Sequence, residues 1–375
     1  MKYYDDRPRE HEEKYGAFFD AYDVDRVEAA RQARQIRERA EREKAERARR
    51  KRKRRLRAYF RRAVALLIVA GLVIWLILGI KSCAAERVEL PDDAPIEAPV
   101  ETAAPVLLVP SLTAQTRTPG DDIYSTNAIL VDAKSGAVLA AKNGEASVRP
   151  ASLVKMMTAL VAIEQVGDVK QTYTFPYEVL APLYRDDEAV MVGYFEGEQA
   201  TLDELFHGML MVSGADAAMG LVDRAADSEE AFVARMNEKA SELGMTGTHF
   251  VDPIGLSDDA RTTCRDLAIL VKAVLDNPYL RGVFSTENYT LPATSFHPDG
   301  IPLKHSMFAK MVGNEPEVAT IKGGKTGFTG AAGYCLASYA VTTDGRTLIA
   351  VTTDANGSYR PVYDAFTLYK EYSHS

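Results

Sequence analysis

The chain has 375 residues and a formal net charge of −8, and 46% of its residues are hydrophobic. This length leaves room for one large domain, or two ordinary ones, together with tails. The three cysteines show no C-x-x-C spacing and no clustered histidines, which excludes the usual metal-binding patterns, so no metal or other cofactor is expected.

Charge is unevenly distributed along the chain. Residues 1–62 contain 22 Lys and Arg against 13 Asp and Glu, a net charge of +9 that leaves −17 for the remainder. Several Glu–Arg pairs there are four residues apart, a spacing typical of an exposed helix. We therefore predict a charged, partly helical arm over 1–62. Its basic end would rest on anionic lipid headgroups; a docking or nucleic-acid-binding arm is the alternative, but its basic run has no interleaved aromatic before Tyr59, and no nucleic-acid partner is expected.

Residues 63–80 form an uncharged apolar run with the length of a membrane-spanning helix. The basic residues directly before it place the N-terminus in the cytoplasm and everything after Lys81 outside, so we predict a single-pass protein of the cell membrane. A cleavable signal peptide is the alternative, because small residues follow at 82–85. The long preceding tail and the length of the apolar run favour an uncleaved anchor.

Residues 81–122 are rich in Pro and Ala and are predicted to form an extended linker. A globular domain is then expected over 123–375. Its predicted elements are a hairpin of strands 127–133 and 137–142, helices at 150–163, 202–212, 215–226, 229–243 and 264–275, strands at 318–326, 333–343 and 346–353, and a closing helix at 360–372. Because strands from both ends would share one sheet, the order predicts an α/β (α+β) domain: an antiparallel sheet flanked by helices, with an inserted all-helical subdomain.

The helix at 150–163 is apolar almost all round, which indicates burial. Two polar residues interrupt its start, Ser152 and Lys155, and a spacing of three puts both on one face. A neutral amine beside a hydroxyl could activate the serine as a nucleophile. Ser152 as a helix cap with Lys155 reaching solvent is the ordinary alternative.

Two further motifs follow. Lys325-Thr326-Gly327 ends a predicted strand rich in glycine, along which an extended substrate would fit, with the cation and the hydroxyl suiting a carboxylate. Ser213 lies between two predicted helices, where it could relay a proton or simply cap a helix.

In this order, Ser152-x-x-Lys155, Ser213-x-Ala215 and Lys325-Thr326-Gly327 resemble the three signatures of the penicillin-binding protein and serine β-lactamase superfamily. The flanking residues look like those of the serine-type D-alanyl-D-alanine carboxypeptidases, the low-molecular-mass penicillin-binding proteins. The resemblance covers about residues 123–372 and implies a β-lactamase/transpeptidase-like fold.

The resemblance also implies roles for these residues. Ser152 would attack the carbonyl between the last two D-alanines of a peptidoglycan stem peptide, with Lys155 as base and Ser213 passing a proton to the leaving D-alanine. Lys325, with Thr326 in the Lys325-Thr326-Gly327 motif, would hold the terminal carboxylate, and Lys325 would help to keep Lys155 neutral. The oxyanion would lie between the N–H groups of Ser152 and Phe328. β-Lactams would be covalent inhibitors.

Two positions depart from the family. Ala215 stands where the second motif normally ends in Asn, and Asp252 stands where Asn usually precedes Pro-x-Gly-Leu. Loss of the amide contacts at Ala215 predicts reduced turnover or altered substrate preference. The sequence does not show whether Asp216 replaces that amide. It also does not show whether Cys264 and Cys335 form a disulfide.

Alternatives to a membrane-anchored D,D-carboxypeptidase remain. A D,D-endopeptidase would use the same residues on cross-links. A class A β-lactamase would need an E-x-x-L-N loop, which we do not find between Ala217 and Cys264. A catalytically impaired wall-binding scaffold is suggested by Ala215 and by the long arm, but retention of Ser152, Lys155, Ser213 and Lys325 argues against it.

Overall fold

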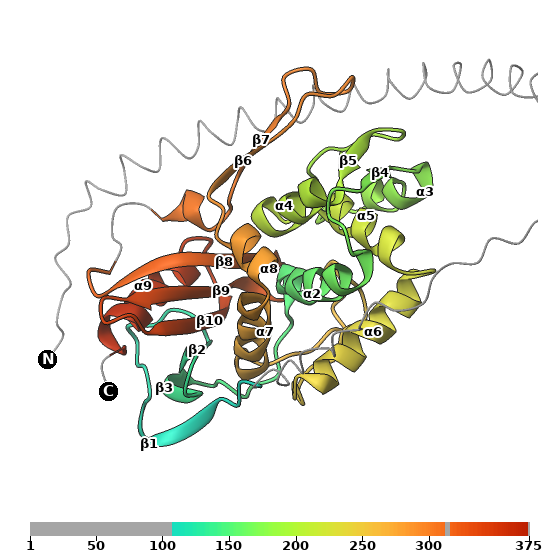
Figure 1. The fold of residues 1–375 in the computed structure, drawn as a ribbon. Helices are drawn as coiled ribbons and strands as arrows, with labels where there is room; N and C mark the ends of the chain where they lie inside the picture. Colours follow the sequence, from blue (N-terminus) through green and yellow to red (C-terminus); the bar gives the residue numbers. More distant parts are fainter. Residues whose placement is uncertain (1–106, 312–315, 374–375) are drawn as a thin grey trace, which may run out of the picture. The chain divides into compact units, whose positions relative to one another are not determined.

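A six-stranded sheet organises the part of the chain described by the computed structural model, residues 107–311 and 316–373 (Figure 1). The strand order is β1-β3-β2-β10-β9-β8. The strands are β1 (Ser111–Arg117), β2 (Asn127–Asp132), β3 (Ala137–Lys142), β8 (Ala319–Thr329), β9 (Gly333–Thr342) and β10 (Thr347–Ala355). The predicted arm (1–62), membrane helix (63–80) and the linker up to residue 106 lie outside the described residues.

Strands from the two ends of the domain do share this sheet. β10 pairs antiparallel with β2, with Leu348 opposite Asp132 and Thr353 opposite Asn127. β2 is buried at every position, which agrees with the apolar run of its four central residues. The prediction of one sheet built from both ends of the sequence is confirmed.

Helices cover both faces of the sheet (Figure 1). α9 (Arg360–Glu371) packs on β9 and β10 from one side. On the other side α7 (Cys264–Asp276) packs on β2, β9 and β10, and α8 (Pro278–Phe284) packs on β8. The two faces therefore bury two separate apolar clusters.

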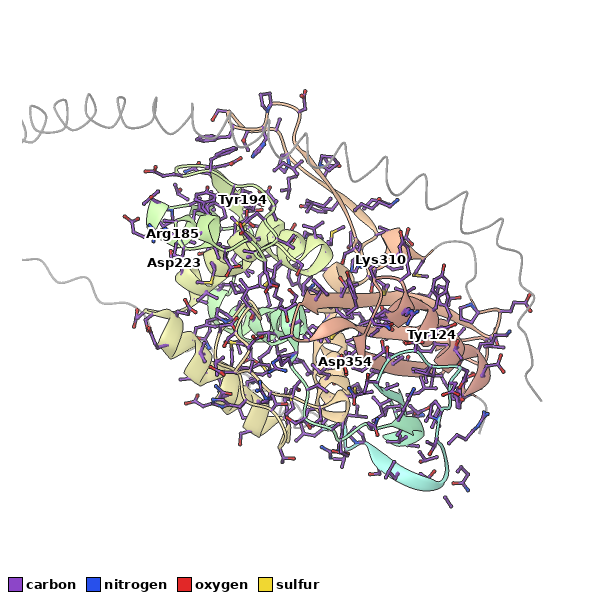
Figure 2. The ribbon with its side chains drawn as sticks, turned by 180° about the vertical axis from the view of Figure 1, so that it is seen from behind. Tyr124, Arg185, Tyr194, Asp223, Lys310 and Asp354 are labelled. Atoms are coloured by element: carbon purple, nitrogen blue, oxygen red, sulfur yellow. The ribbon has the colours of Figure 1, made fainter. Side chains whose placement is uncertain are left out.

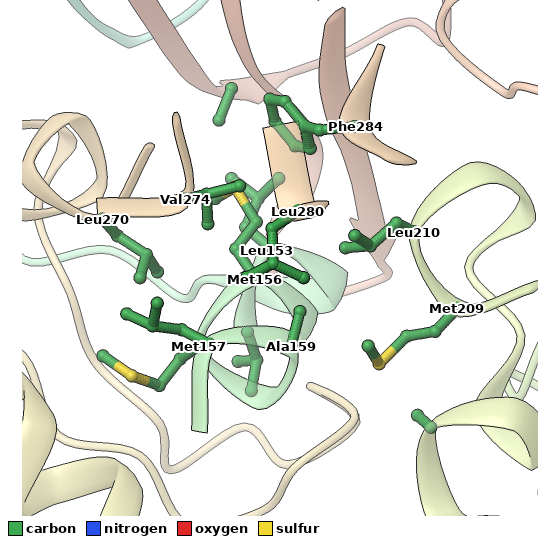
Figure 3. Packing of buried hydrophobic residues seen from close by; sticks show 14 of the residues in the cluster. Leu153, Met156, Met157, Ala159, Met209, Leu210, Leu270, Val274, Leu280 and Phe284 are labelled. Atoms are coloured by element: carbon green, nitrogen blue, oxygen red, sulfur yellow. The ribbon is translucent and has the colours of Figure 1, made fainter. Parts of the chain in front are cut away.

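The centre of the larger cluster is α2 (Val154–Val166), which follows a 3₁₀ turn, η1 (Ala151–Leu153), and ends at Gly167. Figure 3 shows Leu153, Met156 and Met157 surrounded by side chains of α4, α7 and α8. The labelled neighbours are Met209, Leu210, Leu270, Val274, Leu280 and Phe284. The predicted burial of this helix is confirmed, and burial on all sides holds its polar first turn in place.

Helices are the main regular elements of the segment between β3 and β8. Besides α2, α7 and α8 it contains α3 (Tyr177–Leu180), α4 (Leu202–Val212), α5 (Ala215–Ala225) and α6 (Glu229–Glu242), with the short turns η2 (Leu183–Arg185) and η3 (Phe308–Lys310). α4 begins with a reciprocal capping box between Thr201 and Glu204, which satisfies two backbone donors of its first turn.

The prediction that this insertion is all-helical is wrong. β4 (Thr172–Thr174) pairs with β5 (Gln199–Thr201), and β6 (Asn288–Leu291) pairs with β7 (Ile301–Lys304). Strands of three or four residues are too short to show an alternating pattern in sequence. The β6–β7 hairpin projects beyond the helices in Figure 1.

The start of the domain also needs correction, because the sheet begins at Ser111 and not near Ile123. β1 is an edge strand that pairs parallel with β3, whereas every other pair of the large sheet is antiparallel. It is exposed at almost every position and consists mainly of polar residues, so it lacks the apolar signal of a core strand.

Two other features of the described residues bear on the predictions. Both Cys264 and Cys335 are free, buried thiols. Within 107–311 and 316–373, no helix combines the length and the apolar composition that crossing a bilayer requires.

Candidate active site

Ser152 lies in η1, at the entrance to α2, and is half-buried. The residue before it, Ala151, has a left-handed backbone with φ of +47°, a conformation that is strained for a residue with a Cβ. Gly255 packs directly beneath this turn: its own φ is +81°, and a Cβ there would lie 2.0 Å from the Ala151 carbonyl oxygen. Glycine at 255 therefore permits the turn that presents Ser152.

Lys155 follows one turn later and is almost fully buried. Its Nζ lies 3.2 Å from Ser152 Oγ and donates to the Ile254 carbonyl oxygen at 2.6 Å. Burial lowers the pKa of Lys155 to about 8, against the opposing effects of the Asp252 and Asp216 carboxylates. The predicted meeting of hydroxyl and amine is confirmed, and the amine can exist in its neutral, basic form near neutral pH.

Asp252 organises the loop that supplies the Ile254 carbonyl. Its Oδ1 accepts from the N–H groups of Ile254 at 2.7 Å and of Gly255, and its Oδ2 accepts from Ser257 N at 2.9 Å. A carboxylate thus serves here as the loop's acceptor, a role that the Oδ1 of an amide could partly fill.

Ser213 terminates α4 in a left-handed conformation, with φ of 67°. Its side chain is buried, yet its Oγ has no hydrogen-bond partner among the described residues. Ser213 Oγ makes no hydrogen bond to Ser152 or to Lys155, so the second motif does not contact the first in this way. A buried hydroxyl without a partner is unfavourable unless something else uses it.

Asp216 does not replace the amide missing at Ala215. Its carboxylate is fully buried and accepts from the N–H groups of Val192 at 2.8 Å, Gly193 at 2.8 Å and Tyr194 at 3.1 Å. The Ala215 N–H donates to the Val190 carbonyl at 2.7 Å. Both residues therefore fasten the loop around 190–194 to the start of α5.

On the sheet side, Lys325-Thr326-Gly327 lies inside β8 and not at its end, because the strand continues to Thr329. Lys325 is fully buried, with Nζ donating to the Thr326 carbonyl at 2.7 Å. A Cβ at Gly327 would lie 3.3 Å from both Ala151 Cβ and Ser152 N. The β8 motif is thus packed directly against the turn that carries Ser152.

The glycines before this motif serve the protein's own packing. A Cβ at Gly323 would lie 2.4 Å from the Phe284 carbonyl oxygen, and one at Gly324 would lie 2.4 Å from Met307 Sδ. The close approach predicted from the glycines is therefore made at these two positions by α8 and by the segment before η3, not by a bound substrate.

Burial lowers the pKa of Lys325 well below its usual value, and the positive charges of Lys155 and Lys310 lower it further. The repulsion between the two motif lysines thus acts on Lys325, whereas burial lowers the pKa of Lys155. An anion arriving beside Lys325 would restore its charge, because an opposite charge favours the protonated form.

Beyond the motif, Phe328 is exposed and stacks on Tyr334, with ring centroids 4.2 Å apart. The Nζ of half-buried Lys310 lies 5.9 Å from the Tyr334 ring centroid. Figure 2 shows Lys310 beside the sheet, with Arg185, Tyr194 and Asp223 in the helical part. Lys310, Phe328 and Tyr334 therefore form a cationic and aromatic surface next to β8.

Two residues beside the β8 motif, Lys310 and Ser306, could not be predicted from the sequence. Ser306 Oγ lies 2.6 Å from Thr326 Oγ1. Neither residue belongs to a recognised motif, and both come from the irregular segment after β7, so no spacing in the sequence links them to β8.

Comparison with known proteins agrees with this geometry. Residues 113–357 match the peptidase S11 family of D-alanyl-D-alanine carboxypeptidases. The D-alanyl-D-alanine carboxypeptidase DacA of Escherichia coli is 30% identical over 253 residues, which are 64% of this chain and 59% of the relative. A D-alanyl-D-alanine endopeptidase of Pseudomonas aeruginosa is 31% identical over 252 residues, 66% of this chain and 76% of the relative.

Among solved structures, a D-alanyl-D-alanine carboxypeptidase of Mycobacterium tuberculosis matches with a TM-score of 0.57 and 26% identity, covering 67% of this chain and 92% of the other. The chain spans 53% and 59% of the length of the first curated relatives it matches. Because the family match covers most of the described domain, the chain belongs to the D-alanyl-D-alanine carboxypeptidase family S11.

Proposed function

We propose that this chain is a serine D,D-carboxypeptidase that removes the terminal D-alanine from peptidoglycan stem peptides through an acyl-enzyme on Ser152. The observation that carries the proposal is the 3.2 Å approach of Lys155 Nζ to Ser152 Oγ, with the amine pKa lowered to about 8. A neutral amine at that distance can accept the hydroxyl proton.

In the proposed reaction, Ser152 Oγ bonds to the carbonyl carbon of the penultimate D-alanine while Lys155 takes its proton. The oxyanion lies between the N–H groups of Ser152 and Phe328. The carbon–nitrogen bond then breaks, and the proton held by Lys155 passes through the Ser213 hydroxyl to the departing amine. Water attacks the ester while Lys155 takes its proton; the carbon–oxygen bond to Ser152 breaks, Lys155 returns the proton to Ser152 Oγ, and the shortened peptide leaves.

The terminal carboxylate of the peptide binds at Lys325 and Thr326 in this proposal. Burial and neighbouring cations lower the pKa of Lys325, so a carboxylate partner stabilises its protonated form. β-Lactams carry a carboxylate and an acylating carbonyl, and are expected to occupy the same groups as covalent inhibitors.

A fluorescent penicillin tests the nucleophile. The full chain and Ser152→Ala are incubated with it, and the adduct is followed on a denaturing gel over hours, alongside D-alanine release from a tripeptide ending in D-Ala-D-Ala. We expect a persistent label and D-alanine release that both require Ser152. No label in either protein would contradict the proposal and favour the wall-binding scaffold.

An endopeptidase acting on cross-links is the second candidate, because the P. aeruginosa relative carries that name and spans a comparable length. The two activities use the same residues. Incubation with a cross-linked muropeptide dimer separates them: cleavage to monomers indicates the endopeptidase, and loss of terminal D-alanine alone indicates the carboxypeptidase.

We also propose that residues 63–80 anchor the chain in the cell membrane, with 1–62 cytoplasmic and the catalytic domain outside. The uncharged run and the basic residues before it support this orientation. The test is membrane association of the full chain that resists alkaline carbonate. Release of the intact chain by carbonate would contradict it.

A further inference from the structure

The candidate site lies between a sheet wall, formed by the β8 motif Lys325-Thr326-Gly327, and a helix wall, formed by η1, the start of α2 and the end of α4. Ser306 contacts both walls. Its Oγ lies 2.6 Å from Thr326 Oγ1 on β8, and its N–H donates to the Met211 carbonyl of α4 at 2.9 Å. Met211 is two residues before Ser213. One residue from the segment after β7 thus touches both the β8 motif and the helix end that carries the second motif.

The backbone around Ser306 is held at several points. His305 N donates to the Glu287 carbonyl at 2.9 Å, and Met307 N donates to His305 Nδ1 at 3.1 Å. Met307 is fully buried against Gly324, where a larger residue would clash with it. The Ser306 hydroxyl is therefore presented to Thr326 from a rigid segment, which is what a positioning role requires.

We propose that Ser306 is a substrate-positioning residue, which orients the Thr326 hydroxyl toward the terminal carboxylate of the substrate. This inference rests on the function proposed above. A threonine hydroxyl has one proton and rotates freely. When Ser306 donates to Thr326 Oγ1, the Thr326 proton is left to donate to the carboxylate beside Lys325.

A bound carboxylate favours this direction of the hydrogen bond, because it accepts hydrogen bonds and cannot donate them. Both hydroxyl groups belong to half-buried residues, so a ligand can reach Thr326. His305 is buried next to Lys325, and its pKa is lowered to about 3 by burial and by that lysine, so it stays neutral and adds no competing charge. The carboxylate is then attracted by Lys325 and aligned by the Thr326 hydroxyl.

The test uses two thioesters that differ only in the carboxylate: N-benzoyl-D-alanyl thioglycolate and its thioglycolamide. Thiol release is followed for the full chain, Ser306→Ala and Ser306→Thr. We expect Ser306→Ala to raise KM for the thioglycolate about tenfold, the effect of one hydrogen bond to a charged group, with kcat nearly unchanged. The thioglycolamide should change less than twofold, and Ser306→Thr should restore the wild-type KM.

Two further comparisons complete the test: a control substitution at another serine, and Ser306→Ala combined with Thr326→Val. Ser285 Oγ makes a similar hydroxyl contact, 2.6 Å from Tyr339 Oη, away from the β8 motif; Ser285→Ala should affect both thioesters equally or not at all. In a Thr326→Val background, Ser306→Ala should add less than a twofold loss, because it acts through the missing hydroxyl.

Equal losses on both thioesters, or no loss on either, would overturn the role of Ser306 while wild-type activity stands. A wild-type chain that hydrolyses neither thioester and takes no penicillin label would overturn the proposed function, and this inference with it.

Discussion

The two walls of the candidate site differ in how completely their polar groups are satisfied. On the sheet wall, Lys325 donates to the Thr326 carbonyl and the Thr326 hydroxyl meets Ser306. On the helix wall, Lys155 has two partners, but Ser213 Oγ is buried with none among the described residues. The side chains of Lys325 and Thr326 are thus hydrogen-bonded before any ligand arrives, although the buried His305 Nε2 nearby has no partner among the described residues; on the helix wall it is the hydroxyl of the second motif itself that is unpaired.

This difference indicates that the helix wall contains groups that lower the free energy of unfolding. A buried polar group without a partner costs on the order of 1–3 kcal/mol. The left-handed backbones of Ala151 and Ser213 lie on the same wall, and such conformations concentrate at functional sites. In the function proposed above, the reactive steps fall to the helix wall and carboxylate recognition to the sheet wall.

Among substitutions on the helix wall, removal of the proposed base Lys155 should lower the acylation rate most. Lys155→Gln is expected to slow acylation by penicillin about 10³-fold, because a positioned general base contributes roughly 10²–10⁴-fold. Stopped-flow or gel-based acylation rates measure this loss. Lys272→Gln, which removes an ion-paired lysine of α7, should leave the rate unchanged. A Lys155→Gln variant that acylates at the wild-type rate would show that another group is the base.

Ser213 offers a sharper comparison, because its hydroxyl has no partner to lose. Ser213→Ala should lower D-alanine release about 10²-fold, the low end expected for a proton-transfer group, while thermal stability stays equal or rises slightly. The matched control is Ser338→Ala, whose hydroxyl lies 3.0 Å from Tyr369 Oη in the core. That variant should lose about 1 kcal/mol of stability and keep its turnover. Destabilisation by Ser213→Ala with full turnover would reverse this interpretation.

The smallest expected effect is a shift in pH dependence. Because the base must be neutral, acylation should fall as pH drops below the Lys155 pKa of about 8. The Asp252 carboxylate raises that pKa. Asp252→Asn should therefore move the acidic limb of the profile, the pH range in which the acylation rate falls, to lower pH, while the asparagine retains an Oδ1 acceptor for Ile254 N. Acylation rates between pH 6 and 9.5 measure the limb.

Asp276→Asn, an exposed carboxylate of α7 paired with Lys272, is the control and should leave the limb in place. A limb that moves to higher pH in Asp252→Asn would mean that the carboxylate does not act on Lys155 through its charge.

Much of the fold follows from local patterns. The strands expected at 333–343 and 346–353 correspond to β9 and β10, and the long apolar or amphipathic runs predict α2, α4, α5, α6 and α7 within a few residues of their observed bounds. The polar edge strand β1 and the short hairpins were missed, because their stability comes from neighbouring elements and not from their own residues.

The site divides in the same way. Ser152 and Lys155 are one helical turn apart, so their meeting depends on local geometry that three residues of spacing already predict. Lys325, Thr326 and Gly327 are likewise a contiguous motif on one strand. The order of the motifs was enough to recognise the family.

Contacts between distant segments were not accessible to such reasoning. Ser306 meets Thr326 across 20 residues, Gly255 accommodates Ala151 across about a hundred, and the Asp216 carboxylate is engaged by the backbone near residue 193. The pKa of Lys155 depends on its burial in a core assembled from α2, α4, α7 and α8. Residue type and spacing specify which groups are available, but burial and the approach of remote backbone set their charge, their orientation and their hydrogen-bond partners.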